Sequence, residues 1–420
     1  MRKLIILGCL SYLVIGLGHV AVGAVMEQLV LHYVIDYETG GQLIMNQFLG
    51  FLAGVLLAPT LIRGLGRRGA VMLAFVGFAV AEAGYAFELG WTVMLILALF
   101  AGFGFGLGET CIGALIIETL GAQKASAMSL LEVFFGVGAL ALPAAAAWLI
   151  LQGYWLWTFG TVGVLAAVTL LLWLFLPLGE AEAFMGKTLV QDGSEQASAA
   201  ARTSDDSRTA KGSAAASGPK AWYSRGDLLL LVLGALFFAV YVGLEMSFAN
   251  YLPAIMGRKS GLSESSATIS LSIFWAAMSF GRLFVGRITG RVGYRNFLLV
   301  CCAGTTVGFA ALLLLDQAAA ATGMIVVTGL AMAGIFAMGL VYLNEAFPDR
   351  IDRTTSILIA CGGLGGAFLP KLTGWLLDTF DVDHAMWQFV GCAAVLLLLM
   401  LLIVREHDRL GRRKRELASA

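Results

Sequence analysis

Ionisable side chains inside long apolar stretches are the residues of this chain that could do chemistry. Glu109 and Glu245 each lie within a long, mostly apolar stretch, and His19 lies in a third. A bare charge at the centre of a bilayer costs at least about 2.5–3.5 kcal/mol on insertion scales, so such a group needs a partner, water or a function. We predict that Glu245, Glu109 and His19 exchange protons. A static role as a helix cap or a polar packing contact is the alternative.

Neutral polar and aromatic side chains in the same kind of stretch could hold a small polar solute. Sugar sites combine amide hydrogen bonds with an aromatic face. The chain offers both kinds of group, and the candidates for substrate binding are Asn46, Gln47, Asn250, Trp275, Tyr342 and Asn344. Most aromatic residues in a chain with 26 Phe will instead face lipid or pack in the interior.

The elements that position these residues are membrane helices. The chain is 59% hydrophobic and only 13% charged, and its mean hydropathy is +0.87. A helix needs about 20 apolar residues to cross a bilayer. This predicts an all-α membrane protein with twelve spans, near 4–30, 41–62, 70–88, 92–119, 126–150, 155–177, 227–250, 265–289, 297–316, 322–346, 354–377 and 386–404.

The second half of the chain repeats the first at a constant offset of 227 residues. Scarce residue types match as well as glycines, and the pairs are Arg68 with Arg295, Glu118 with Glu345, Pro143 with Pro370 and Trp148 with Trp375. A parallel repeat of six membrane helices is typical of transporters whose substrate site lies between the halves. We therefore expect bundles at 1–178 and 225–405, a flexible linker at 179–224 and a basic tail at 406–420.

The distribution of Lys and Arg predicts the orientation in the membrane. Nearly all of them lie at the amino terminus, in alternate loops, in the linker and in the tail, whereas the opposite loops hold only Arg258 and Lys259. By the positive-inside rule this predicts a multi-pass protein of the cell membrane with both termini cytoplasmic. The basic residues Arg409–Arg415 would also attract anionic lipid headgroups.

Other functional classes find no support in the sequence. The six cysteines lie in apolar stretches without CxxC spacing, so neither a metal site nor a disulfide is expected. No nucleotide-binding loop and no catalytic triad are present, which predicts no enzyme activity and no cofactor. The expected partners are a small-molecule substrate, protons and membrane lipids, with no nucleic acid, and the chain is expected to be a monomer.

Four short stretches resemble a known family. The run from Gly281 to Arg295 resembles the signature loop of the major facilitator superfamily. Tyr241–Glu245, Phe274–Arg282 and Phe134–Ala139 resemble the fucose–galactose–glucose:proton symporter branch and its relatives. Family members often carry Asn-x-x-His in the fifth span, where this chain has Ser129 and Glu132. The Gly-Pro signature of drug–proton antiporters is absent from that span.

The resemblance implies a two-bundle fold and roles for further residues. In this fold spans 1, 4, 7 and 10 line a central cavity, which would place His19, Glu109 and Glu245 there. Spans 5 and 8 are neighbours, so Glu132 and Arg282 are expected to form an ion pair, either a gate or a static staple. A loop charge network is expected to contain Arg68, Glu118, Arg295 and Glu345.

The implied function is secondary active transport by alternating access. Our first interpretation is proton-coupled uptake of a sugar or a similar small polar solute. The alternative is proton-driven export of drugs or of a secreted metabolite. A transport-inactive receptor on the same fold is a third class, and the carboxyl groups retained in the membrane argue against it.

Overall fold

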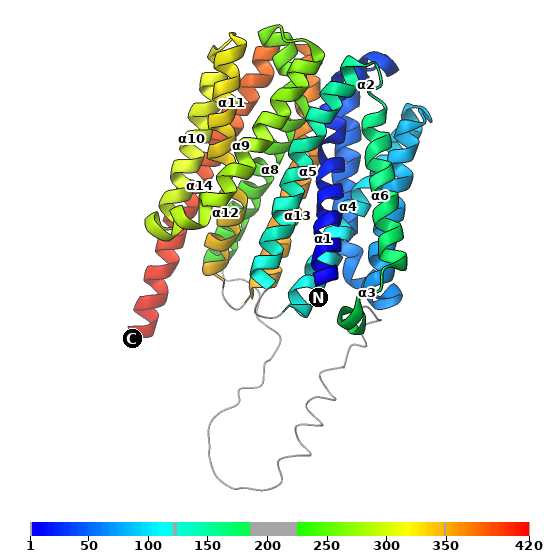
Figure 1. Ribbon diagram of the computed structural model, residues 1–420. Helices are drawn as coiled ribbons and strands as arrows, with labels where there is room; N and C mark the ends of the chain where they lie inside the picture. Colours follow the sequence, from blue (N-terminus) through cyan, green and yellow to red (C-terminus); the bar gives the residue numbers. More distant parts are fainter. Residues whose placement is uncertain (1, 121–123, 185–224, 348–349, 420) are drawn as a thin grey trace.

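The computed structural model describes residues 2–120, 124–184, 225–347 and 350–419, which form helices joined by short turns. The first half holds α1 (Arg2–Ala24), α2 (Met26–Tyr33), α3 (Tyr37–Ala86), α4 (Trp91–Thr119), α5 (Lys124–Leu151), α6 (Trp157–Phe175) and the 3-10 helix η2 (Gly179–Phe184). The second half holds α8 (Arg225–Ser260), α9 (Glu264–Val292), α10 (Tyr294–Leu314), α11 (Ala318–Met332), α12 (Ile335–Glu345), α13 (Ile351–Thr379) and α14 (Val382–Ser419). The blue and cyan helices of the first half lie beside the green, yellow and red helices of the second (Figure 1).

The predicted membrane spans are confirmed, with differences where helices merge or break. Within the described ranges, 11 helical segments are long and apolar enough to cross a membrane. The 50-residue α3 contains two of the predicted spans, separated by non-helical backbone at Gly66. The tenth predicted span is divided into α11 and α12. The fold is therefore the predicted twelve-span arrangement, and the chain is a multi-pass membrane protein.

The internal repeat is visible in the backbone of two turns. Gly66 has φ 75° and ψ 167°, and Gly293, 227 residues later, has φ 79° and ψ 154°. Residues with a Cβ atom rarely adopt these angles, so both turns require glycine. The same chemistry thus reverses the chain after the second span of each half.

Helix packing repeats at the same offset. A Cβ atom at Gly102 would lie 1.7 Å from the carbonyl oxygen of Gln47, and one at Gly329 would lie 3.0 Å from that of Phe274. Both members of the first pair are related to the second by 227 residues. Small residues allow membrane helices to approach closely, and here they fix the same α3–α4 and α9–α11 contact in the two halves.

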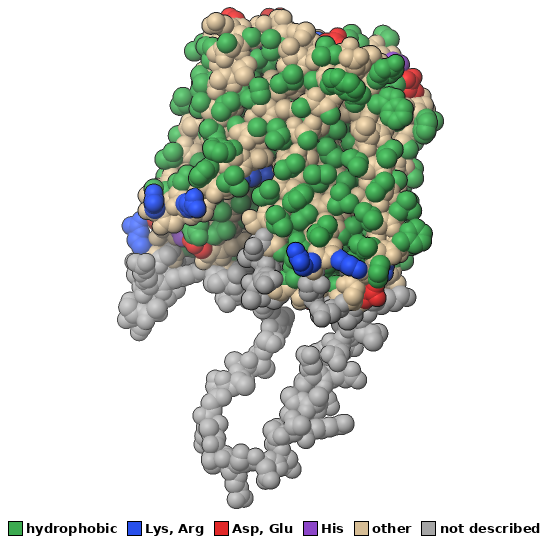
Figure 2. All heavy atoms as spheres, in the orientation of Figure 1, with side chains coloured by type: hydrophobic (Ala, Val, Ile, Leu, Met, Phe, Trp, Pro, Cys, Tyr) green, Lys and Arg blue, Asp and Glu red, His purple; other side chains and the backbone are tan. Residues whose placement is uncertain are grey.

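The surface divides the molecule into an apolar flank and two different ends. Hydrophobic side chains cover the flank, and Lys and Arg gather at the end that carries both termini (Figure 2). We call this the terminal end, and we call the opposite end, where α1 finishes and α3 begins, the distal end. Beyond Phe184 the predicted linker lies outside the described residues, while the predicted tail continues α14 as helix to Ser419.

The predicted loop charge network has different partners from those expected. Arg67, not Arg68, pairs with Glu118. Arg68 instead donates to the carbonyl oxygens of Trp173, Leu174 and Leu176 at the end of α6. Its repeat equivalent Arg295 reaches α14, where it lies 3.1 Å from Asp408, and Glu345 is exposed at the end of α12. Both arginines therefore tie a turn to the last helix of their own half, because a long side chain at that turn reaches the neighbouring helix end.

Candidate functional site

The two halves meet where α1 crosses α8. The Nε2 atom of His19 lies 3.3 Å from the sulfur of Met246, which is its repeat equivalent. One turn further, a Cβ atom at Gly23 would lie 2.7 Å from the Cα atom of its equivalent, Asn250. A residue contacts its own equivalent only near the axis that relates two copies. These pairs therefore mark the pseudo-twofold axis between the bundles.

Two small cavities flank this axis. One is lined by His19, Ile44, Gln47, Phe48, Phe51, Phe105 and Asn250, and the other by His19, Val20, Gly23, Met246, Ala249, Asn250, Leu271 and Trp275. Ile44 and Phe48 of the first are the repeat equivalents of Leu271 and Trp275 of the second. The larger of the two has a volume of about 10 Å³, room for about one water molecule. The central site is thus closed down in this conformation.

Two hydrogen-bond donors in the cavity lining have no acceptor. The Nε2 group of Gln47 and the Nε1 group of Trp275 are buried without a hydrogen-bond partner among the described residues. An unpaired buried donor costs about 1–3 kcal/mol. Acceptor oxygens on a small polar solute could meet both donors from opposite halves, so Gln47, Trp275, Asn250 and His19 form one candidate binding site.

The structure places three other predicted binding residues elsewhere. Asn46 donates to the carbonyl oxygen of Leu95 in α4 at 2.8 Å, because a helix turns about 100° per residue and cannot point two neighbours the same way. Tyr342 stacks on His407 with ring centroids 4.6 Å apart. Asn344 donates to Thr355 at 2.7 Å. Tyr342 and Asn344 lie in the terminal half of α12, away from the cavities.

Acidic groups gather on the terminal side of the cavities. Glu245 is buried in α8, and its Oε1 atom lies 3.8 Å from Arg282 of α9. Glu132 of α5 is within electrostatic reach of Arg282, and Glu109 of α4 is within reach of Glu132. The phenol of Tyr12 donates to the backbone carbonyl of Glu109 at 3.3 Å. The three carboxyl groups share one guanidinium, so full ionisation would leave two negative charges uncompensated.

The partner of Arg282 differs from the one expected. Among the ion pairs of the described residues, Arg282 contacts Glu245 of its own half and not Glu132 of the other. Glu132 is exposed, although protein surrounds it on most sides, which places it at an open space between the bundles. A direct Glu132–Arg282 pair therefore stays a prediction for another conformation.

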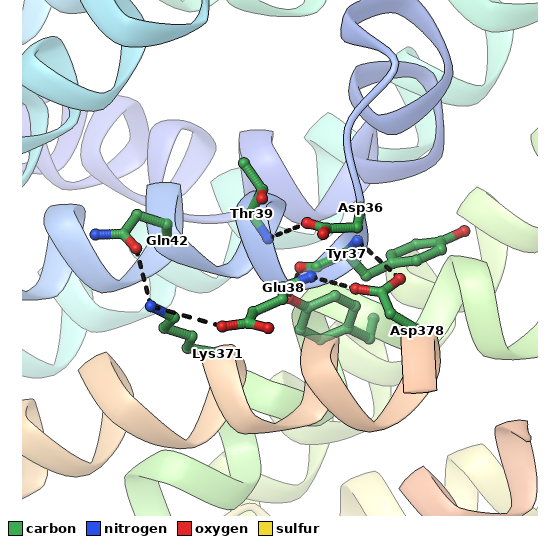
Figure 3. A network of polar contacts seen from close by, with 8 residues as sticks. Asp36, Tyr37, Glu38, Thr39, Gln42, Lys371 and Asp378 are labelled. Atoms are coloured by element: carbon green, nitrogen blue, oxygen red, sulfur yellow. Dashed lines mark hydrogen bonds and ion pairs between the residues drawn. The ribbon is translucent and has the colours of Figure 1, made fainter. Parts of the chain in front are cut away.

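Polar contacts join the halves at the distal end. Lys371 of α13 lies 3.0 Å from Gln42 and 3.8 Å from Glu38, both in α3 (Figure 3). Asp378 accepts from the backbone N–H groups of Tyr37 at 2.9 Å and Glu38 at 2.6 Å. The phenol of Tyr251 donates to the carbonyl oxygen of Tyr37 at 2.9 Å. The distal end is therefore closed.

Sequence reasoning missed several of these residues. Phe48 and Met246 could have been found from the repeat, since they are the equivalents of Trp275 and His19. Asp378 and Glu38 carried no such signal, because each lies near a helix end and their partners are more than 300 residues away in the sequence.

Comparisons with known proteins agree with this architecture. The family profile described as "Major Facilitator Superfamily" matches residues 8–327 and 319–419. The chain belongs to this superfamily. It is a secondary transporter with a small-molecule substrate and is not an enzyme, as the sequence predicted.

Individual relatives refine this placement. The chain is 27% identical over 399 residues to the glucose/mannose transporter GlcP of Bacillus subtilis, covering 94% of this chain and 93% of that protein. It is 30% identical over 176 residues to a glucose/galactose transporter of Brucella abortus, covering 39% and 40%. The inward open structure of the xylose transporter XylE from E. coli matches with a TM-score of 0.73 at 16% identity, covering 94% of each chain. The predicted family and branch are confirmed.

Proposed function

We propose that this superfamily member takes up a hexose or a similar small polar solute together with protons. The observation that carries the proposal is the pair of unpartnered donors, Gln47 and Trp275, on opposite sides of the pseudo-twofold axis. A sugar offers hydroxyl oxygens to both donors and apolar ring faces to Phe48 and Trp275. The glucose-transporting relative, aligned over nearly the whole chain, supports the same substrate class.

The charge distribution supports a cytoplasmic terminal end. Lys and Arg gather there, in keeping with the positive-inside rule (Figure 2). With that orientation in the cell membrane, the closed distal end is the outer one and the conformation faces inward. Uptake then requires the distal contacts of Lys371 and Asp378 to break and the terminal end to close.

Glu245 is the proposed coupling carboxyl group. It is buried next to the cavity residue Met246, and Arg282 is its cationic partner. A proton and Arg282 compete for the same carboxylate, so a movement of Arg282 changes the affinity of Glu245 for protons. Glu109 and Glu132 would then relay protons between this site and the terminal end, while His19 contributes to substrate binding on the axis.

Export of a cationic compound is the second candidate. The observation in its favour is that Glu109 and Glu132 lie on the terminal side of the cavity, where a cation arriving from that side would meet two carboxyl groups. Hexose uptake explains the two unpartnered donors better, because a cation supplies no acceptor for them.

Transport into proteoliposomes tests the proposal. An inward-directed proton gradient should drive accumulation of radiolabelled D-glucose, with unlabelled D-mannose and D-galactose as competitors. A protonophore should abolish accumulation but leave glucose exchange intact. No hexose transport, together with proton-driven movement of ethidium, would contradict the proposal and favour the exporter.

A further inference from the structure

Three serines of α9 face α5 across the boundary between the halves. Ser265, Ser272 and Ser279 follow one another at intervals of seven residues, two helical turns, and so lie on one face of α9. The hydroxyl of Ser265 donates to the carbonyl oxygen of Ala147 at 2.9 Å. The hydroxyl of Ser272 donates to that of Leu140 at 2.9 Å. Seven residues down α9 thus correspond to seven residues along the antiparallel α5.

The third serine has no such partner. The Oγ atom of Ser279 is buried without a hydrogen-bond partner among the described residues. The helix α5 still passes close by, since a Cβ atom at Gly136 would lie 2.7 Å from that oxygen. The register set by the first two serines assigns the carbonyl oxygen of Val133 as the third acceptor. The ladder of hydrogen bonds therefore stops one step short of the terminal end.

Arg282 lies one helical turn beyond Ser279, and Glu132 adjoins Val133. In this conformation the guanidinium contacts Glu245 instead. The groups around this point come from four helices: Tyr241 and Glu245 from α8, Arg282 from α9, Glu132 from α5 and Glu109 from α4. Continuing the same register would bring Arg282 and Glu132 together.

We propose that closing the terminal end completes this ladder and moves Arg282 from Glu245 to Glu132. Ser279 then donates to the carbonyl oxygen of Val133, and Glu245, without its cation, accepts a proton. When the terminal end reopens, Arg282 returns and displaces that proton toward the terminal side. The coupling part rests on the proposed function, whereas the Ser279 contact concerns the conformational change alone.

The Ser279 contact can be tested without any substrate. Spin labels at Val34→Cys and Phe380→Cys, in a background with the six native cysteines replaced, report the distance between the halves at the distal end. A hydrogen bond between membrane helices contributes enough to shift an equilibrium about threefold. Ser279→Ala should shift the population toward the short distance, and the matched variant Ser272→Ala should shift it toward the long distance. Shifts in the same direction, or an unshifted Ser279→Ala, would overturn the proposal.

Charge reversal tests the exchange of partners. Glu132→Arg and Arg282→Glu should each reduce glucose exchange at least tenfold, because neither variant can close the terminal end with an ion pair. The double variant should recover exchange to within about threefold of the wild type, yet fail to accumulate glucose against a gradient, because Glu245 has lost its cation. Recovery of both activities, or of neither, would overturn the exchange. An absence of glucose transport in the wild type would reject the proposed function and leave the spin-label result standing.

Discussion

The imidazole of His19 contacts the thioether of Met246 at 3.3 Å, and these two residues are equivalents in the internal repeat. The backbone at the centre of the molecule is therefore nearly symmetric, while its chemistry is not. One half presents a ring nitrogen and the amide of Gln47, and the other presents a sulfur and the indole of Trp275. An asymmetric lining on a pseudo-symmetric axis selects a single orientation of the substrate.

Gln47→Leu should weaken substrate binding without unfolding the protein. The variant removes a buried donor that we assign to a sugar hydroxyl, and leaving that hydroxyl unpaired costs about 1–3 kcal/mol. We expect KM for glucose to rise about tenfold or more, as measured by exchange in proteoliposomes. The neighbouring variant Asn46→Leu is the control, because Asn46 bonds to α4 and should affect stability more than KM. Equal KM values for the two variants would argue against Gln47 as a binding residue.

Asp378→Ala should loosen the distal end. The carboxylate accepts two N–H groups at the start of α3 from the opposite half, and both donors lose that acceptor in the variant. We expect thiol reagents added from the distal side to label a cysteine at position 48 several-fold faster than in the parent. Asp381→Ala removes an exposed carboxylate from the same loop and should leave the rate unchanged. A similar rate in both variants would show that Asp378 does not hold this end closed.

Glu82 offers a test of stability away from the transport site. This side chain is 0% exposed, and neither carboxyl oxygen has a hydrogen-bond partner among the described residues. Glu82→Leu should stabilise the protein by about 1–3 kcal/mol, because an unsatisfied polar group is removed, and should leave glucose transport unchanged. Thermal unfolding in detergent measures this, with Thr158→Val as a second buried polar replacement. A less stable Glu82→Leu would reveal an ion or water bound to this carboxyl group.

Asp36 should stabilise α3 in a pH-dependent manner. Its side chain accepts from the N–H of Thr39 at 2.7 Å, and hydrogen bonding to Thr39 lowers the pKa of Asp36 below its usual value. A lowered pKa means that the stabilisation is present above about pH 4, the usual value, and disappears as pH falls through the lower one. Asp36→Ala should cost about 1 kcal/mol at pH 7, and this difference should shrink in acid. Asp36→Asn keeps an acceptor and should show little pH dependence.

The sequence predicted the fold well because apolar length and the repeat are local or periodic signals. The turns at Gly66 and Gly293 also followed from the repeat, since both positions needed glycine for the same backbone reason. Helix breaks without such a marker, as between α1 and α2 or between α11 and α12, were not predicted. These breaks depend on tertiary packing and leave hydropathy unchanged.

The site was predictable only in part, for a different physical reason. Glu245, Gln47 and Trp275 were recognisable as polar or aromatic groups in apolar helices. Their partners were not, because contacts between the halves join residues hundreds of positions apart and change with conformation. Arg282 illustrates this, since its choice between Glu245 and Glu132 depends on which end of the molecule is closed.

Glucose-evoked charge movement in Glu245→Gln proteoliposomes tests the central claim most directly. On a solid-supported membrane, wild-type protein should give a current on addition of D-glucose that grows with an inward proton gradient. Glu245→Gln should abolish the current while glucose exchange, measured on the same preparation, stays within about tenfold of the wild type. A variant that keeps its glucose-evoked current would contradict the assignment of Glu245 as the coupling residue.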